Sequence, residues 1–231
     1  MKGVSICITA YNAQDYIKEC LDSVIKQTWF QNHDNWEIIV GVDGCEKTLD
    51  YLKGIMHDYK NLRVLMMDSN RGTYITSNTI MSQAKYDTLF RYDSDDKMRR
   101  TLVDVVMKRK GKYSVLRYYH KNFGLNSRVQ IGYGAICFDK SVFMKYGGFR
   151  PWICSADAEI YMRLSRVEPV ITIKNVLSSR RVHKSSLTQS PETGYKSELR
   201  DYYRSLMKSM DIKNTEDAVI EMETNTFKEI I

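Results

Sequence analysis

The chain has 231 residues, which is enough for one packed domain with a small extension. Hydrophobic residues make up 43% and charged residues 27%, with only three prolines, so the composition excludes a disordered, collagen-like or low-complexity chain. Thirty-five Lys and Arg residues against 28 Asp and Glu residues give a net charge of +7, which predicts an anionic partner without saying which one.

The cysteines and the N-terminus bear on the cellular compartment. The five cysteines are widely spaced and form no CxxC pair, so neither a disulfide framework nor a zinc site is predicted. The apolar run at 4–9 is too short for a secretion signal, and no stretch approaches the roughly 20 apolar residues that a membrane span needs. We therefore expect a cytoplasmic protein with reduced thiols and no transmembrane segment.

The first half of the chain alternates short apolar runs with helical patterns. Ile17, Cys20, Leu21, Val24 and Ile25 recur at helical spacing and predict a helix over 17–25. Other helices are expected at 49–56 and leading up to residue 84, and strands at 4–9, 37–42, 62–67 and 88–92. This alternation predicts an α/β fold with a mostly parallel central sheet and helices on both faces.

The second half has a looser pattern. Helices are expected at 98–107, 141–146, 156–166 and 198–210, and strands at 113–119, 134–138, 169–174 and 176–182. The polar segment 185–194, which contains Pro191, is expected to be a loop or linker.

Three carboxylates follow the strand expected at 88–92, in Asp93-Ser94-Asp95-Asp96. Open α/β sheets bind their ligands at this edge. Carboxylates so close together repel one another unless a cation lies between them, and Mg²⁺ or Mn²⁺ prefers such oxygen ligands. The alternative is structural, because Asp95 or Asp96 could cap the helix expected from residue 98.

Five segments of the first 100 residues have the order and spacing of a known family. They are Thr9-Ala10-Tyr11-Asn12 after the first strand, Val42-Asp43-Gly44 after the second, Asn70-Arg71-Gly72, the pair Asn78 and Ala84, and the acidic cluster. In this pattern the chain resembles the family 2 glycosyltransferases, which have the Rossmann-like GT-A fold. The family has two acids where this chain has Val42-Asp43, so the resemblance leaves the nucleobase open.

The second half continues the resemblance to about residue 190. Gly147-Gly148-Phe149 is similar to the family's GGF segment, and Asp157 matches the second residue of a Glu-Asp pair whose first position is Ala156 here. The run 181–188 resembles the signature R-x-H-x-x-S-x-[ST]. The resemblance implies a GT-A domain at 1–190, with a nucleotide-sugar half at 1–96 and an acceptor half at 97–190, and a C-terminal helical extension at 191–231.

The resemblance also implies a donor site for a nucleoside-diphosphate sugar, with UDP as the usual carrier. Ala10, Tyr11 and Asn12 would surround the base, and Asp43 would hydrogen-bond the base or the ribose. Arg71 would meet the diphosphate, and Asp93 would contact the ribose or a metal-bound water. The alternatives are that Asp43-Gly44 is only a turn and that Arg71 is only a solvated loop residue.

The metal and the catalytic base follow from the same resemblance. Asp95 would ligate a divalent metal, Mn²⁺ or Mg²⁺, with His183 as a further ligand or a diphosphate contact. Asp157 would be the general base that deprotonates the acceptor hydroxyl, so that a single displacement inverts the anomeric configuration. The alternatives are a structural His183 and an Asp157 that caps the next helix, with Glu159 as the second candidate base.

The positive charge is concentrated between residues 97 and 121, where nine basic residues stand against one acidic residue, interleaved with aromatic residues. We expect this segment near the active site, where it would contact an anionic acceptor. The alternative is a solvated helix face. The residues expected to bind the acceptor or another anion are Arg99, Arg100, Lys108, Arg109 and Lys110.

Two acceptors are compatible with this enzyme, and a third interpretation is not enzymatic. We slightly favour hydroxymethylated DNA, because a small basic chain without an anchor fits a virus-encoded DNA-modifying sugar transferase in a host cytoplasm. The alternative acceptor is a surface polysaccharide or lipid-linked saccharide. The last possibility is a non-catalytic nucleic-acid-binding module, which would need the basic segment but not Asp95, Asp157 or His183.

Overall fold

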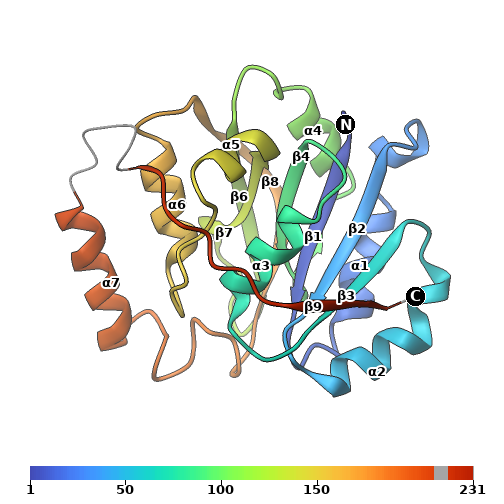
Figure 1. Ribbon diagram of the computed structural model, residues 1–231, viewed down its shortest axis with the longest axis horizontal. Coiled ribbons are helices and arrows are strands. Elements are labelled where there is room, and N and C mark those ends of the chain that lie inside the picture. Colours follow the sequence, from blue (N-terminus) through green and yellow to red (C-terminus); the bar gives the residue numbers. More distant parts are fainter. Residues whose placement is uncertain (211–217, 231) are drawn as a thin grey trace.

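The computed structural model describes residues 1–210 and 218–230. Its centre is a sheet to which both halves of the chain contribute strands (Figure 1). Among the described residues this sheet has nine strands in the order β5-β8-β6-β7-β4-β1-β2-β3-β9. The strands are β1 (Val4–Ala10), β2 (Trp36–Val42), β3 (Leu62–Met67), β4 (Thr88–Asp93), β5 (Lys97–Met98), β6 (Val115–Gly124), β7 (Val129–Asp139), β8 (Val170–Val182) and β9 (Phe227–Ile230).

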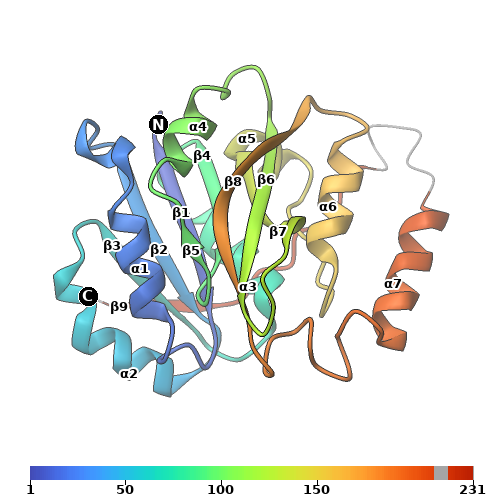
Figure 2. The ribbon, with the colours of Figure 1, turned by 180° about the vertical axis from the view of Figure 1, so that it is seen from behind.

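The helices cover both faces of the sheet, as expected. Helices α1, α2 and α4 lie on the face seen in Figure 2, and α3, α5 and α6 lie on the opposite face, seen in Figure 1. The helices are α1 (Ile17–Ile25), α2 (Glu46–Ile55), α3 (Thr73–Ser82), α4 (Leu102–Met107), α5 (Lys140–Lys145), α6 (Ala156–Leu164) and α7 (Glu198–Ser209). Two short 3₁₀ turns, η1 (Thr28–Gln31) and η2 (Met56–Asp58), complete the first half.

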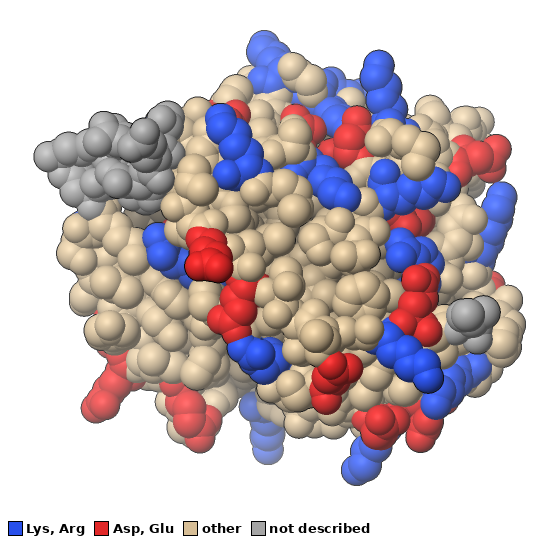
Figure 3. Space-filling model, viewed as in Figure 1, with Lys and Arg blue, Asp and Glu red and all other residues tan. Residues whose placement is uncertain are grey.

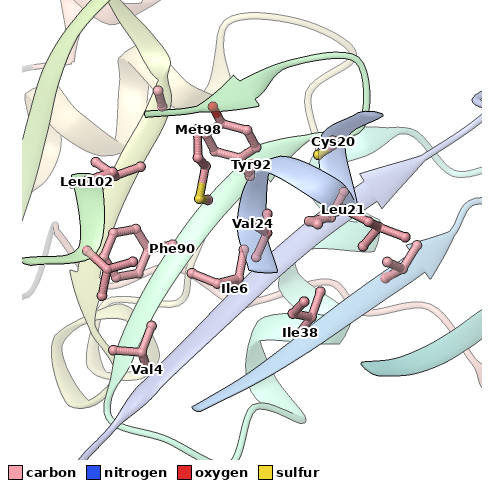
Figure 4. Close-up of a cluster of buried hydrophobic side chains, with 14 of the residues drawn as sticks. Val4, Ile6, Cys20, Leu21, Val24, Ile38, Phe90, Tyr92, Met98 and Leu102 are labelled. Atoms are coloured by element: carbon pink, nitrogen blue, oxygen red, sulfur yellow. The ribbon is translucent and has the colours of Figure 1, made fainter. Parts of the chain in front are cut away.

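Two apolar cores follow from the alternation of side chains along the strands. Ile6 and Ile8 of β1 pack against Leu21 and Val24 of α1 in the first core. Figure 4 shows part of it, with Phe90 and Tyr92 of β4 facing the same layer. Cys7, one position along β1, points to the second core under α3, α5 and α6. Burial on both faces explains why the early strands are continuous apolar runs.

The α/β architecture agrees with the prediction, but the sheet is mixed. Strands β4, β1, β2 and β3 are parallel, as is the pair β6 and β8. The pairs β3–β9, β4–β7, β5–β8 and β6–β7 are antiparallel. The parallel block is the first half of the chain, which places the carboxyl ends of β1, β2 and β4 at one edge.

Five predicted elements need correction in the second half. Met98 lies in β5 and not in the helix, which begins at Leu102 because residues 97–98 pair with β8. β6 lies further along the chain than expected, and β7 starts at Val129 rather than 134. The strands expected at 169–174 and 176–182 are one strand, β8, which continues past a bulge beside β6.

The C-terminal segment contains more than the expected helix. After α7, residues 218–230 cross the α3 and α6 face and end in β9 (Figure 1). β9 pairs antiparallel with β3, from Met67 with Phe227 to Val64 with Ile230. The segment is therefore part of the central sheet.

The structure also bears on the expected state of the cysteines and on membrane-spanning helices. All five cysteines are buried as free thiols. Among the described residues, none of the helices has the length and apolar character needed to cross a membrane.

Candidate active site

The parallel strands bring three predicted segments to one edge of the sheet. Ala10 at the end of β1 pairs with Val42 of β2, and Thr9 pairs with Asp93 of β4. Asn12, Asp43 and the acidic cluster therefore follow neighbouring strands at the same edge.

Asp93 is held by a buried arginine of its own strand. Arg91 is 3% exposed, and its Nη2 lies 2.6 Å from Asp93 Oδ1. Burial raises the pKa of the Asp93 carboxyl, Arg91 opposes that rise, and the nearby Asp95 adds to it. The Arg91 guanidinium is fixed by the Gly134 carbonyl (2.9 Å) and the Thr73 hydroxyl (2.9 Å).

Gly134 of β7 marks the space between two carboxylates from distant parts of the chain. A methyl group placed on Gly134 would lie 3.3 Å from Asp93 Oδ2 and 3.8 Å from Asp157 Oδ2. Asp93 and Asp157 thus face a common space in which Gly134 leaves room. The structure thus places near one another two carboxylates, Asp93 and Asp157, that belong to separate sequence motifs.

Asp157 stands in the first turn of α6 and is half-buried. Its Oδ1 accepts hydrogen bonds from the Tyr74 hydroxyl (2.9 Å) and from the backbone N–H of Ala158 (3.0 Å). Burial raises the pKa of Tyr74 well above its usual value, and the Asp157 charge adds to this, so the phenol stays protonated and donates. Asp157 Oδ2 remains directed to the space beside Gly134.

Glu159, the second candidate base, has a structural role. Its side chain is 2% exposed and accepts hydrogen bonds from Arg163 Nε (2.8 Å) and Arg150 Nε (3.0 Å). Arg163 also donates to the carbonyls of Tyr146 and Gly148, which fixes the GGF segment. Because the Glu159 carboxylate is buried and paired with two arginines, it cannot reach an acceptor hydroxyl to deprotonate it.

Asp95 and His183 meet although they are far apart in the sequence. Asp95 Oδ2 lies 3.0 Å from His183 Nε2, and His183 Nδ1 lies 2.8 Å from the Ser185 hydroxyl. Both side chains are about one-quarter exposed, at 24% and 22%. By contrast, Asp96 is buried and accepts a hydrogen bond from the Arg181 backbone N–H (2.8 Å).

The donor chemistry of Asp95 and His183 fits a divalent metal. Neighbouring ligands of an octahedral ion bound at about 2.1 Å are about 3.0 Å apart, close to the separation of the two atoms here. A carboxylate oxygen and an imidazole nitrogen suit Mn²⁺. Among the described residues, however, no cluster of three or more His, Cys, Asp or Glu side chains is arranged to hold a metal, so further ligands would come from substrate or water.

Asp43 and Arg71, which are predicted to contact the sugar nucleotide, interact with other parts of the protein in this structure. Asp43 is 3% exposed and accepts hydrogen bonds from the backbone N–H groups of Arg71 (3.0 Å) and Gly72 (3.0 Å) and from the Thr76 hydroxyl (2.8 Å). It therefore holds the loop before α3 and contacts the first turn of that helix through Thr76. The Arg71 guanidinium forms an ion pair with Glu223 of the C-terminal segment.

The residues at the end of β1 and directly after it, which are predicted to surround the base, are exposed to very different extents. Ala10 is buried at the end of the strand, and Tyr11 is 52% exposed. Asn12 has a positive φ of 50° and accepts a contact from the Cys45 thiol at 3.4 Å. Tyr11 thus offers an exposed aromatic face at the sheet edge.

The basic segment is divided between two ends of the sheet, which corrects the expectation that all of it lies near the active site. Lys110 binds Asp87 (2.5 Å), which precedes β4, and so lies with Lys108 and Arg109 at the amino end of that strand, opposite the acidic cluster. Figure 1 places α4 at that end, beside the N-terminus.

The earlier part of the basic segment lies elsewhere. Arg99 lines a surface pocket of about 400 Å³ with Lys97, Lys121 and Phe123, and Arg100 is exposed beside it in the chain. Figure 3 shows charges of both signs interspersed over the α3 and α6 face. The five predicted anion-binding residues therefore form no continuous patch.

The sequence matches the family described as "Glycosyl transferase family 2" over residues 5–144. The chain belongs to this family. The match includes all five segments predicted in the first 100 residues, and ends before Asp157 and His183.

Two relatives illustrate the range of this glycosyltransferase family. The chain is 31% identical over 101 residues to TuaG of Bacillus subtilis, named for teichuronic acid biosynthesis, which covers 42% of this chain and 37% of that protein. It is 30% identical over 135 residues to the poly(ribitol-phosphate) beta-glucosyltransferase of Bacillus spizizenii, covering 58% and 19%. The chain thus spans well under half of either relative.

Solved structures show the same fold at low identity. TarS 1–349 of S. aureus in complex with UDP-GlcNAc has a TM-score of 0.73 at 18% identity, over 94% of this chain and 69% of that one. The mannosyltransferase PcManGT of Pyrobaculum calidifontis, in complex with GDP-Man and Mn²⁺, has a TM-score of 0.66 at 15% identity, over 79% and 58%. The GT-A fold is thereby confirmed.

Three residues of this family 2 site were absent from the sequence predictions. Tyr74 and Arg91 hold Asp157 and Asp93, and Gly134 leaves the space between them. Arg91 did carry a signal, since it is a charged residue inside an apolar strand. Tyr74 carried none, because its partner lies 83 residues away.

Proposed function

We propose that the chain is a metal-dependent, inverting glycosyltransferase that moves a hexosyl or pentosyl group from a nucleoside-diphosphate sugar to an acceptor hydroxyl. The observation that carries the proposal is the pair Asp93 and Asp157 on either side of Gly134. A carboxylate with one oxygen fixed by Tyr74 and the other directed to an open space is suited to accept a proton.

The donor would lie at the carboxyl edge of β1, β2 and β4. Tyr11 would pack on the base, and Asp93 would contact the ribose or a metal-bound water. Asp95 and His183 would hold Mn²⁺ or Mg²⁺, which would neutralise the charge on the departing nucleoside diphosphate. UDP is the carrier that we favour, since the TarS structures contain UDP and UDP-GlcNAc.

Asp157 would orient the acceptor hydroxyl and take its proton as the oxygen attacks the anomeric carbon. Asp43 would act indirectly, because two of its hydrogen bonds hold the 70–72 loop and the third holds Thr76 of α3. Arg71 would have to exchange Glu223 for a phosphate to contact the diphosphate.

For the acceptor we propose a saccharide of a surface polysaccharide, and no longer DNA. The names of the relatives, which refer to teichuronic acid and poly(ribitol-phosphate), support a polysaccharide acceptor. The division of the basic residues between two ends of the sheet removes the main argument for a nucleic acid. The cytoplasmic location remains a prediction.

A donor and acceptor panel tests this proposal. Purified protein with Mn²⁺ is offered UDP- and GDP-sugars with no acceptor, with a set of saccharides, and with hydroxymethylated DNA. We expect nucleoside-diphosphate release from one donor, abolished by EDTA, and a glycosylated saccharide of inverted anomeric configuration. Failure to release nucleotide from any donor would refute the enzymatic assignment, whereas glycosylated DNA would refute only the acceptor.

A further inference from the structure

An aromatic and cationic cluster lies one helical turn from Asp157. Tyr161 is four residues further along α6, so it shares a helix face with the proposed base. Tyr133 of β7 directly precedes Gly134, the residue that faces both catalytic carboxylates. The cluster therefore lies between α6 and the strands β6 and β7, next to the residues that line the proposed reaction space.

The two tyrosines and one arginine form a single wall. The rings of Tyr133 and Tyr161 are 5.5 Å apart and tilted by 55°. The Arg117 guanidinium of β6 lies 3.9 Å from the Tyr161 ring centre and 4.8 Å from that of Tyr133. All three side chains are half-buried, so the wall is partly open to solvent.

Arg117 is a cation whose charge is not balanced locally. Its Nε donates to the Thr172 hydroxyl at 2.9 Å, which fixes the orientation of the guanidinium. Within residues 1–210 and 218–230 it forms no ion pair, and its two Nη groups donate to no protein acceptor. By contrast, Arg63, Arg91, Arg150 and Arg163 each pair with a carboxylate.

These features match the chemistry of a charged sugar. The apolar C–H face of a pyranose packs on an aromatic ring, and the guanidinium nitrogens present parallel donors that match a carboxylate or phosphate. A core-packing role alone would need the rings, but would not need a half-buried cation without a carboxylate.

We propose that Tyr133, Tyr161 and Arg117 form an acceptor subsite for a saccharide unit that carries an oxyanion, either a carboxylate or a phosphate. This rests on the proposed function, because it takes Asp157 as the base. The unit bound here would place a hydroxyl toward Asp157, one turn along the helix. The charge on the unit, and not its ring alone, would determine acceptor choice.

Binding of three methyl glycosides tests the subsite. The probes are methyl β-D-glucoside, methyl β-D-glucuronide and methyl β-D-glucoside 6-phosphate, titrated into the full chain with UDP and Mn²⁺ and followed by saturation-transfer NMR. We expect the wild-type protein to bind at least one anionic probe about 5-fold more tightly than the neutral one. The two anionic arms distinguish a carboxylate from a phosphate.

Variants of Arg117 and Tyr161 test separately how the positive charge and the aromatic ring contribute to binding. Arg117→Gln is expected to remove the preference for the anion, and Arg117→Lys to restore part of it. Tyr161→Ala is expected to weaken all three probes, whereas Tyr161→Phe keeps the ring and should bind like the wild type. Arg204→Gln, on exposed α7, is the matched control, and the melting temperature reports whether each variant folds.

The outcomes are distinguishable from those of the proposed function. A protein that binds UDP but none of the glycosides, that shows no anion preference, or whose preference survives Arg117→Gln would overturn the subsite. A protein that binds the anionic glycosides through Arg117 but neither binds nor cleaves a sugar nucleotide would retain the subsite and refute the glycosyltransferase.

Discussion

The Tyr74 hydroxyl donates a 2.9 Å hydrogen bond to Asp157 Oδ1, which joins the start of α3 to the start of α6. The first half of the chain thus orients the proposed base, which the second half supplies. Because the bond fixes one carboxylate oxygen, it leaves the other directed to the space beside Gly134.

Tyr74→Phe should therefore impair the chemical step while the protein remains folded. Loss of one hydrogen bond to a charged group predicts a decrease in kcat of about 10-fold, with little change in the KM for the donor. Steady-state kinetics measures both constants. Tyr51→Phe, on α2 away from the site, should behave like the wild type, and an equal loss in both variants would exclude the orienting role.

Asp95→Asn is expected to weaken Mn²⁺ binding in the presence of UDP by at least about 10-fold, since it removes a charged ligand. Isothermal titration calorimetry gives the affinity. Asp96→Asn is the matched control from the same cluster, because Asp96 faces the Arg181 backbone and an asparagine oxygen can accept that hydrogen bond. Equal effects of the two substitutions would contradict the assignment of Asp95.

Gly134→Ala tests the space between the carboxylates. The added methyl group would lie 3.2 Å from Arg91 Nη1 and 3.3 Å from Asp93 Oδ2, so we expect roughly 10-fold lower turnover in a folded protein. Gly54→Ala is the control, since no atom lies within 4 Å of its added carbon. That substitution should keep activity and add about 0.5–1 kcal/mol to the free energy of unfolding, because Gly54 is in a helix.

The parts of the fold that the sequence predicted well are those with a strong local signal. The strands at 4–9, 37–42, 62–67 and 88–92 are apolar runs buried on both faces, and each lies within one residue of its structural bounds. β9 has no such signal, because Phe227–Ile230 is short and half polar and becomes a strand only by pairing with β3. The start of β7 was missed because Gly132 and Gly134 interrupt the pattern that Val129 and Ile131 begin, and glycine is unfavourable in strands.

In the candidate site, too, the residues that belong to local motifs were predicted, and the contacts between distant segments were not. Asp93, Asp95, Asp157 and His183 belong to local motifs, and the structure brings them together in two pairs. Asp43 was expected to face the donor, but its partners are N–H groups of a loop almost 30 residues away, whose shape depends on tertiary contacts. Long-range contacts of this kind leave no mark on local spacing.

Because His120 is buried, we predict that the free energy of unfolding decreases in acid. Burial lowers the pKa of its imidazole to about 4, with a contribution from the nearby Arg180 charge. The unfolded chain, with a pKa near 6.5, then binds more protons between these values, so stability is greatest above about pH 6.5 and falls toward pH 4. For this one group the loss is up to about 3 kcal/mol.

Urea denaturation at pH 7 and pH 4.5 measures this effect as a difference between proteins. In His120→Phe the slope of stability with pH should be shallower than in the wild type, whatever the absolute stability of the variant. His57→Gln, in the exposed turn η2, should keep the wild-type slope. An unchanged slope in His120→Phe would show that His120 is not the group responsible.

The most direct test of the central claim is the initial rate of nucleoside-diphosphate release with Mn²⁺, donor sugar nucleotide and saccharide acceptor, for the wild type and for Asp157→Asn. We predict release and transfer by the wild type and a decrease of about 10² to 10⁴ in Asp157→Asn, with UDP binding unchanged, because only proton transfer is lost. Equal transfer rates in the two proteins would contradict the account.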